Sequence, residues 1–264
     1  MSMIIDTIEN KRGKPAVIEG FQRNGYVLEK GLFSLEELAE VRRVVQTFHD
    51  KWLKDNQEFY QERAINSAFL TAPKYLNDQQ RMVLFDFVSC QKILNILQKA
   101  IPQTPAFMNT QLFFNPYNAQ QANYWHRDTQ YHMDLSQQQA ALQGPEVVHI
   151  RIPLTHEPGI ELVPGSHTRW DSQEELDVRM EKNQHTSSQA LATGLEIPLQ
   201  AGDALLFSAN MIHRGLYGMD RFSLDLLYCE SEPEFVKFIQ PDCLPNSQQL
   251  SQLENPSMFV MDKE

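Results

Sequence analysis

The feature that most limits the fold is a run of short strand-forming segments that begins near residue 105. The clearest is 146–154, EVVHIRIPL, in which apolar residues alternate with His149 and Arg151. Alternate residues of a strand point to opposite faces, so this segment predicts one apolar and one polar face. The other strand-forming segments, separated by turn signals, are 106–114, 160–163, 195–199, 204–207 and 221–228. Many short strands in succession favour a β-sandwich or jelly roll over an alternating α/β sheet.

The chain before residue 105 is predicted to be mostly helical. Residues 25–28 form a short predicted strand, after which Ser34 and Glu37 have the spacing of a capping box. From there, apolar residues recur at helical spacing, at Leu38, Val41, Val45, Phe48 and Trp52. A second helix is predicted from about 78 to 100, before Pro102. These helices are expected to pack one apolar face each against the strands.

We expect a single domain, because the chain has neither an internal repeat nor a linker-like stretch. Its helical part covers about 1–104, its barrel about 105–230 and a C-terminal extension 231–264. The 264 residues carry a net charge of −11 and no basic patch, which argues against a nucleic-acid partner. No apolar run approaches the length of a membrane span. The expected partner is a small molecule, and the expected state is a monomer or homodimer.

The cysteines and the N-terminus indicate a cytoplasmic protein. Cys90, Cys229 and Cys243 are odd in number and form no CxxC pair, which favours reduced thiols. Residues 1–15 have neither a long apolar core nor a cleavage site of small residues, so we expect no signal peptide.

The chemically most informative residues are His126 and Asp128, which stand two positions apart after Tyr124-Trp125. In an extended segment such residues project from the same face, and together they can offer one imidazole and one carboxylate to one point. His213, between two late strands, completes a set of two histidines and one carboxylate. This set binds iron(II) in oxygenases and leaves three coordination positions open. Rival candidates for the third ligand are His132, His149, His156, His167 and His185.

An ordered series of motifs around these residues resembles the phytanoyl-CoA dioxygenase family of iron(II)/2-oxoglutarate oxygenases. The matching segments lie between residues 18 and 230. They are FQRNGYV at 21–27, GLFS at 31–34, WHRD at 125–128, IPL at 152–154, LVPGSH at 162–167, GD at 202–203 and HRG at 213–215. The resemblance implies a double-stranded β-helix, which is a cupin-like jelly-roll barrel, buttressed by the N-terminal helices.

The same resemblance implies that iron(II) binds His126, Asp128 and His213 and that Arg221 pairs with the distal carboxylate of 2-oxoglutarate. An arginine fork also suits a carboxylate on physical grounds. Ser223, on the strand face of Arg221, and Gln111, on a neighbouring strand, are further candidates for cosubstrate contacts. The stretch between His213 and Arg221 is shorter than is usual in the family. Arg214 and Arg151 are therefore alternatives to Arg221.

Arg151 and His149 share the polar face of their strand and are candidates for substrate binding. An arginine there would suit an anionic or zwitterionic metabolite, although a salt bridge is the alternative role for Arg151. The expected specificity loops are 55–74, 131–144 and 169–192, which offer the aromatic residues Tyr60, Phe69, Tyr131 and Trp170.

Hydroxylation of a small molecule, with release of succinate and CO2, is the expected reaction, and demethylation or desaturation would differ only in how the substrate is placed. The carboxylate of Asp128 favours oxygenation over halogenation. One alternative function is a cupin-like binding protein without turnover. Another is a zinc hydrolase on the same ligands, but that would lack an evident general base and leave Arg221 unexplained.

Overall fold

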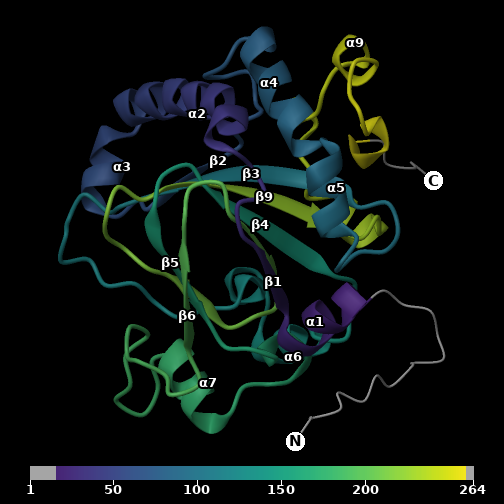
Figure 1. The fold of residues 1–264 in the computed structure, drawn as a ribbon. Helices are drawn as coiled ribbons and strands as arrows, with labels where there is room; N and C mark the ends of the chain where they lie inside the picture. Colours follow the sequence, from purple (N-terminus) through teal and green to yellow (C-terminus); the bar gives the residue numbers. More distant parts are fainter. Residues whose placement is uncertain (1–15, 260–264) are drawn as a thin grey trace, which may run out of the picture.

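The computed structural model describes residues 16–259, and two antiparallel β-sheets form its centre (Figure 1). The larger sheet has the strand order β1-β7-β4-β9-β3-β2, and the smaller one has the order β6-β5-β8. The strands are β1 (Tyr26–Glu29), β2 (Asn66–Ala68), β3 (Ala106–Phe114), β4 (Val147–Pro153), β5 (Glu157–Leu162), β6 (Leu195–Leu199), β7 (Ala204–Ser208), β8 (His213–Gly215) and β9 (Phe222–Cys229). This is the jelly-roll fold with helical additions that the sequence predicts.

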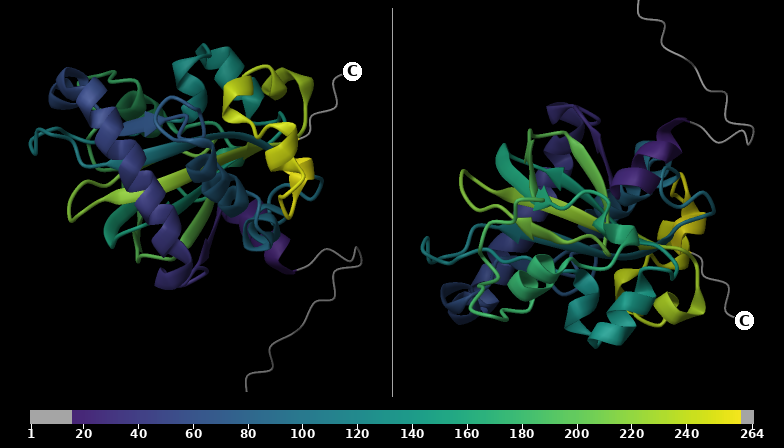
Figure 2. Two further views of the ribbon diagram at one scale, coloured as in Figure 1. Left: turned by 90° about the horizontal axis from the view of Figure 1, so that it is seen from above. Right: turned by 90° about the horizontal axis from the view of Figure 1, so that it is seen from below.

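Helices cover the outer face of the larger sheet. In the left view of Figure 2, α2 lies across the strands of this sheet. The helices are α1 (Ala16–Asn24), α2 (Leu35–Asp55), α3 (Gln57–Glu62), α4 (Asp78–Val88), α5 (Gln91–Leu97), α6 (Leu135–Ala141), α7 (Gln173–Arg179), α8 (Pro233–Val236) and α9 (Ser247–Leu250). Short 3-10 turns are η1 (Asp128–Tyr131), η2 (Ser166–Thr168), η3 (Pro241–Cys243) and η4 (Pro256–Phe259). The predicted capping box is present, because Ser34 and Glu37 each bond the other's backbone N–H at the start of α2.

The core follows from the alternation in β4. Val148, Ile150 and Ile152 are fully buried against the helices, together with Leu224 and Leu226 of β9. Full burial of one such side chain contributes roughly 1.5–3 kcal/mol. The same strand turns His149 and Arg151 to the opposite face, toward the space between the two sheets. The predicted apolar and polar faces of this strand are therefore confirmed.

The stretch predicted to be helical from about 78 to 100 is divided in the structure into two helices, α4 and α5. The hydroxyl of Ser89 donates to the carbonyl of Phe85, and Cys90 takes an extended conformation that begins the next helix. A serine that bonds back to its own helix competes with continued helical geometry. The break lets both short helices turn apolar residues to the core, at Leu84, Phe85, Val88, Ile93, Ile96 and Leu97.

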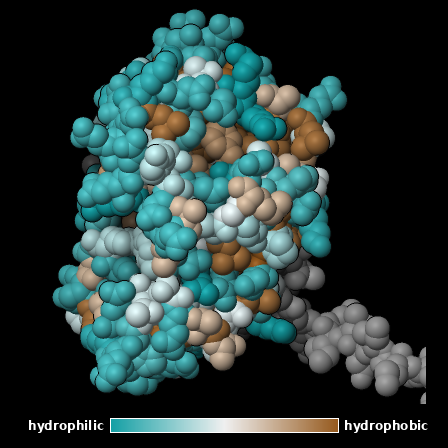
Figure 3. All heavy atoms as spheres, turned by 90° about the vertical axis from the view of Figure 1, so that its left-hand side faces the viewer, coloured by the Kyte–Doolittle hydropathy of each residue, from teal (hydrophilic) through white to brown (hydrophobic). Residues whose placement is uncertain are grey.

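Within residues 16–259, no helix is long and apolar enough to cross a membrane. The face drawn in Figure 3 is mostly hydrophilic, with exposed hydrophobic side chains in small separate groups. The segment for which we expect no signal peptide, residues 1–15, lies outside the described residues.

Candidate metal centre and active site

His126 and His213 are brought together by their own backbones. The N–H of His126 donates to the carbonyl of His213 at 3.0 Å, and the N–H of His213 donates back at 2.9 Å. This isolated antiparallel bridge places the two ring centroids 4.3 Å apart. His213 opens β8 of the smaller sheet, and His126 lies on a segment that pairs with β8 at this bridge.

The two imidazoles present the same nitrogen to the space between them. Nδ1 of His126 lies 3.2 Å from the carbonyl oxygen of Tyr124, and Nδ1 of His213 lies 3.0 Å from that of Met211. A carbonyl oxygen only accepts, so each Nδ1 carries the proton and each Nε2 keeps its lone pair. Such outer bonds are typical of histidines that bind metals.

Asp128 completes the donor set, although not from an extended segment as predicted. Asp128 is the first residue of the 3-10 turn η1. This turn, rather than a strand, directs its carboxylate toward His126. Its Oδ1 lies 3.5 Å from Nε2 of His126 and 3.7 Å from Nε2 of His213. One ligand atom from each of the three residues lies within 4.8 Å of the others, a grouping that could hold a metal ion.

The electrostatics of the centre keep Asp128 ionised and His213 neutral. Burial and the nearby His126 together lower the pKa of His213 to about 3. Burial alone would raise the pKa of Asp128, but the neighbouring imidazoles, chiefly that of His149, hold it well below its usual range. A neutral imidazole and a carboxylate are the protonation states that a divalent metal requires.

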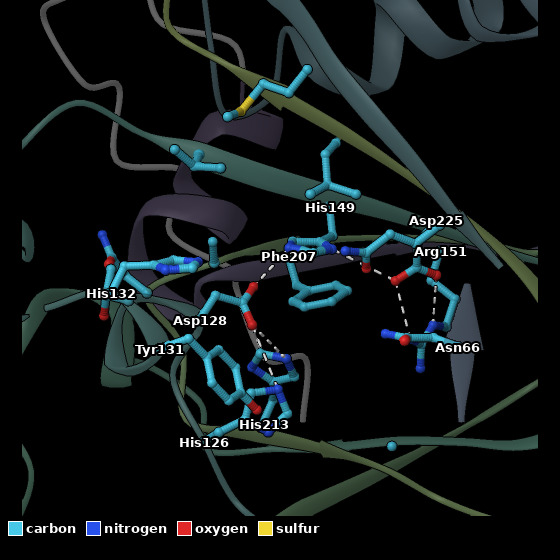
Figure 4. Close-up of a pocket in the computed structure, with 18 of the residues that line it drawn as sticks. Asn66, His126, Asp128, Tyr131, His132, His149, Arg151, Phe207, His213 and Asp225 are labelled. Atoms are coloured by element: carbon cyan, nitrogen blue, oxygen red, sulfur yellow. Dashed lines mark hydrogen bonds and ion pairs between the residues drawn. The ribbon is translucent and has the colours of Figure 1, made fainter. Parts of the chain in front are cut away.

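A cavity of about 800 Å³ opens beside these three residues, between the two sheets. His149, Arg151, Gln111 and Arg221 all line it, as expected for side chains on the inner faces of β3, β4 and β9. Ser223 does not line it: its hydroxyl is buried and has no hydrogen-bond partner among the described residues. Figure 4 shows Asp128 between the two triad histidines on one side and His149 on the other.

Arg151 is held by Asp225, its cross-strand partner on β9. Its Nε donates to Oδ1 at 2.8 Å and its Nη2 to Oδ2 at 3.0 Å. The salt bridge considered as the alternative role of Arg151 is therefore present. The third nitrogen, Nη1, is buried without a partner in the described part of the chain. Arg214 is committed elsewhere, because its Nε donates to Glu161 at 2.6 Å and it does not line the cavity.

Arg221 lies in the cavity wall, where it forms a buried ion pair with Glu157 and its Nη1 makes a long hydrogen bond to the carbonyl of Phe114. Its Nε lies 3.7 Å from a Glu157 carboxylate oxygen and has no hydrogen-bond partner in the described structure. Burial and the nearby charge of Arg151 lower the pKa of Arg221 to about 10. A Cβ at Gly215 would stand 2.5 Å from Nη2 of Arg221, so glycine gives the guanidinium its space. Two buried guanidinium groups with unpartnered nitrogens fit an anion such as a carboxylate.

A model of the phytanoyl-CoA dioxygenase family matches residues 21–216, about three quarters of the chain. The chain belongs to this family. It is an enzyme of the iron(II)/2-oxoglutarate-dependent oxygenase class, with iron as cofactor and 2-oxoglutarate as cosubstrate. Both fit the residues present, since the three donors suit a divalent metal and the guanidinium groups suit a carboxylate. Comparison with curated proteins gives no match.

Solved structures support the fold. EctD from S. alaskensis, determined with 2-oxoglutarate and 5-hydroxyectoine, has a TM-score of 0.60 at 15% identity, with 89% of this chain and 84% of that chain covered. AviO1 from Streptomyces viridochromogenes Tue57 has a TM-score of 0.55 at 18% identity, covering 81% and 94%. SnoK, described as a carbocyclase from nogalamycin biosynthesis, has a TM-score of 0.54 at 14% identity, covering 84% and 86%. At these identities the likeness shows the fold alone.

The loops around this family fold contribute unequally to the cavity. Ile65 and Asn66 come from the expected loop 55–74, and Tyr131 with several later residues comes from 131–144. No residue of 169–192 lines the cavity, so the expected role of that loop is wrong. It packs behind the metal motif instead, where Asp171 bonds the guanidinium of Arg127.

Sequence reasoning missed the partners of the charged residues. Asp225 follows Arg221 and Ser223 at the strand spacing of two, and that spacing was the available signal. Arg127, between the two ligand candidates, is fully buried and shares Asp171 with Arg179. No local pattern indicates that pairing, because Asp171 is 44 residues away.

Proposed function

We propose that this enzyme hydroxylates a small molecule, with iron(II) held by His126, Asp128 and His213. The observation that supports the proposal is the convergence of two imidazole Nε2 atoms and one carboxylate oxygen at the wall of a large cavity. The family makes oxygenase chemistry the expected activity and gives no support to the zinc hydrolase or to the binding protein without turnover.

The overall reaction balances as substrate C–H plus O2 plus 2-oxoglutarate giving substrate C–OH plus succinate plus CO2. The bound iron supplies the activation of dioxygen, and the protein supplies position. The bonds from Nδ1 to Tyr124 and Met211 keep the Nε2 lone pairs of His126 and His213 directed at one point. His213 is buried, whereas the side chain of Asp128 is 29% exposed at the cavity wall.

Arg221 is the proposed partner of the distal carboxylate of 2-oxoglutarate. Arg214 is hydrogen-bonded to Glu161 and Arg151 to Asp225, whereas Arg221 has an ion pair of 3.7 Å with Glu157 and no hydrogen bond to a carboxylate among the described residues. Gln111 lines the same cavity and can donate an amide hydrogen bond. Ser223 is a further proposed contact of the cosubstrate. Its hydroxyl is buried and lies outside the cavity lining.

The substrate is proposed to be a metabolite with an apolar body and an anionic or zwitterionic group. Met108, Leu227 and Phe235 contribute apolar surface to the cavity wall. Arg151 lines the same wall, and its buried Nη1 has no hydrogen-bond partner among the described residues, which supports a negatively charged group on the substrate. Demethylation or desaturation would need the same ligands and a different placement of the substrate. The three cysteines form no disulfide in the described structure, which supports the proposal that the protein works in the cytoplasm.

The test is a spectrum of the anaerobic protein with iron(II) and 2-oxoglutarate. The chelated cosubstrate should give a weak visible charge-transfer band, and His126→Ala should lose it because one of the three donors is gone. His156→Ala is the matched control, since His156 is exposed and lies outside the cavity lining. Identical spectra for wild type and His126→Ala would refute the assigned ligands. Succinate release with candidate metabolites would then identify the substrate.

A further inference from the structure

A row of buried charged side chains leads from Asp128 into the larger sheet. Nε2 of His149 lies 2.7 Å from Oδ2 of Asp128, and Nδ1 of His149 lies 3.6 Å from Oδ2 of Asp225. Arg151 closes the row with its two hydrogen bonds to Asp225. His149 is 5%, Arg151 2% and Asp225 0% exposed, so the row is shielded from solvent.

The backbone fixes the geometry of this row. Arg151 and Asp225 are directly opposite in the β4–β9 pair, and His149 stands two residues earlier on the same face of β4. The ring of His149 also stacks on Phe207, its cross-strand partner on β7, with centroids 4.9 Å apart and an interplanar angle of 18°. His149 is therefore oriented from two neighbouring strands and has little freedom to turn away from Asp128.

The two oxygens of Asp128 face different partners. Oδ1 faces the Nε2 atoms of His126 and His213, and Oδ2 lies in a 2.7 Å ionic contact with Nε2 of His149 but makes no hydrogen bond among the described residues. We propose that His149, backed by Asp225 and Arg151, is a positioning residue that keeps Oδ2 occupied and so leaves Oδ1 alone for the metal. This inference rests on the proposed function, because it assumes that the three residues hold the metal.

The expected benefit is an open coordination position. An octahedral metal with three protein donors has three positions left, of which a chelating 2-oxoglutarate fills two. A carboxylate that used both oxygens would fill the third and leave none for the remaining reactant. A partner of a ligating carboxylate typically affects metal affinity about 10- to 100-fold. A residue that merely fills the core would affect folding stability instead.

The experiment measures binding of Co(II) alone to the metal-free full chain by anaerobic titration calorimetry at one fixed pH. His149→Leu removes the group that orients the Asp128 carboxylate. Because Oδ1 is then no longer held toward the metal, Co(II) binding is expected to weaken by about 10- to 100-fold, and stronger binding would overturn the inference. His149→Gln keeps an N–H donor and should recover part of this loss. His156→Leu is the matched control, because His156 is exposed outside the cavity lining, and its affinity should equal that of wild type. Thermal unfolding of each metal-free variant reports folding separately.

Equal Co(II) affinity for folded His149→Leu and wild type would overturn the inference, as would equal losses for the Leu and Gln variants. If His149→Leu does not fold, Asp225→Asn carries the test, because it leaves His149 in place and removes the charge behind it. We expect it to lose affinity by less than the roughly 10-fold typical of a direct partner of a ligand, and an unchanged affinity would overturn the inference. A wild-type protein that binds no Co(II) would instead refute the proposed function.

Discussion

The two faces of the larger sheet are built from the same strands and are stabilised in different ways. On the outer face Val148, Ile150 and Ile152 pack under the helices, where any arrangement that fills the volume keeps water out. On the inner face His149 and Arg151 stand at the alternating positions and reach specific atoms of Asp128 and Asp225. The outer face thus depends on volume and the inner face on directed contacts.

This difference implies that substitutions on the two faces should fail in different assays. Loss of volume on the outer face should reduce the free energy of unfolding and leave the metal centre intact. Loss of one directed contact on the inner face should change metal affinity or turnover first, because its partner is left buried and misplaced. Four predictions test this separation.

The largest effect is expected at the end of the inner row, in Asp128→Ala. Removal of the carboxylate leaves two histidine donors and an uncompensated His149, so turnover should fall by roughly a thousandfold or more. Rates of succinate formation and Co(II) titration check this. Turnover within about tenfold of wild type would mean that Asp128 is not a ligand.

Directed contacts also stabilise the segment that carries the ligands, and Arg127→Ala tests this. The side chains of Arg127 and Asp171 are fully buried, and Arg127 also donates to the backbone carbonyls of Ser166 and Asn210. The substitution removes these buried hydrogen bonds, leaves Asp171 with Arg179 as its remaining cation, and should cost about 3–5 kcal/mol. Arg43→Ala is the matched control, because its ion pair with Glu40 is exposed and should change stability by less than about 1 kcal/mol. Urea unfolding of the metal-free proteins measures both values. Similar losses would contradict the contrast.

A third prediction concerns pH at the start of β4, where Glu146 accepts a hydrogen bond from the Ser208 hydroxyl. Burial raises the pKa of Glu146 from 4.5 to about 7, so the folded state favours its protonated form. Its contribution is complete below pH 4.5 and is lost as the pH rises toward 7, on the order of 2 kcal/mol. Glu146→Gln should flatten the unfolding free energy across this window. An unchanged pH profile would exclude Glu146 as the cause.

The smallest effect is expected on the outer face, in Ile150→Val. Deletion of one buried methylene from a fully buried side chain should cost about 0.5–1.5 kcal/mol of unfolding free energy. Co(II) affinity should stay equal to that of wild type, because Ile150 points away from the cavity. A large loss of affinity from this substitution would show that the two faces are coupled.

Local sequence patterns predicted most of the strands and the polarity of the faces of β4, but they did not predict β2 or β8. The segment 106–114 is predicted with the bounds that β3 has, and the alternation in β4 predicts the shared polar face of His149 and Arg151 that lines the cavity. The His126 and Asp128 pair and the order of motifs indicated the family, which the family model confirms. These features depend on residues close together in the chain, where spacing alone carries the information.

The tertiary structure alone decided which charged groups meet. The β4–β9 register pairs Arg151 with Asp225, and the bridge between His126 and His213 joins segments 87 residues apart in the numbering. It also left Arg221 beside Glu157 rather than firmly paired, which favours Arg221 over Arg214 as the proposed cosubstrate residue. Such contacts depend on how distant strands align. The type of a side chain and its odd or even position in the strand predict the face that it occupies. Only the packing of the sheets determines which atom the side chain reaches.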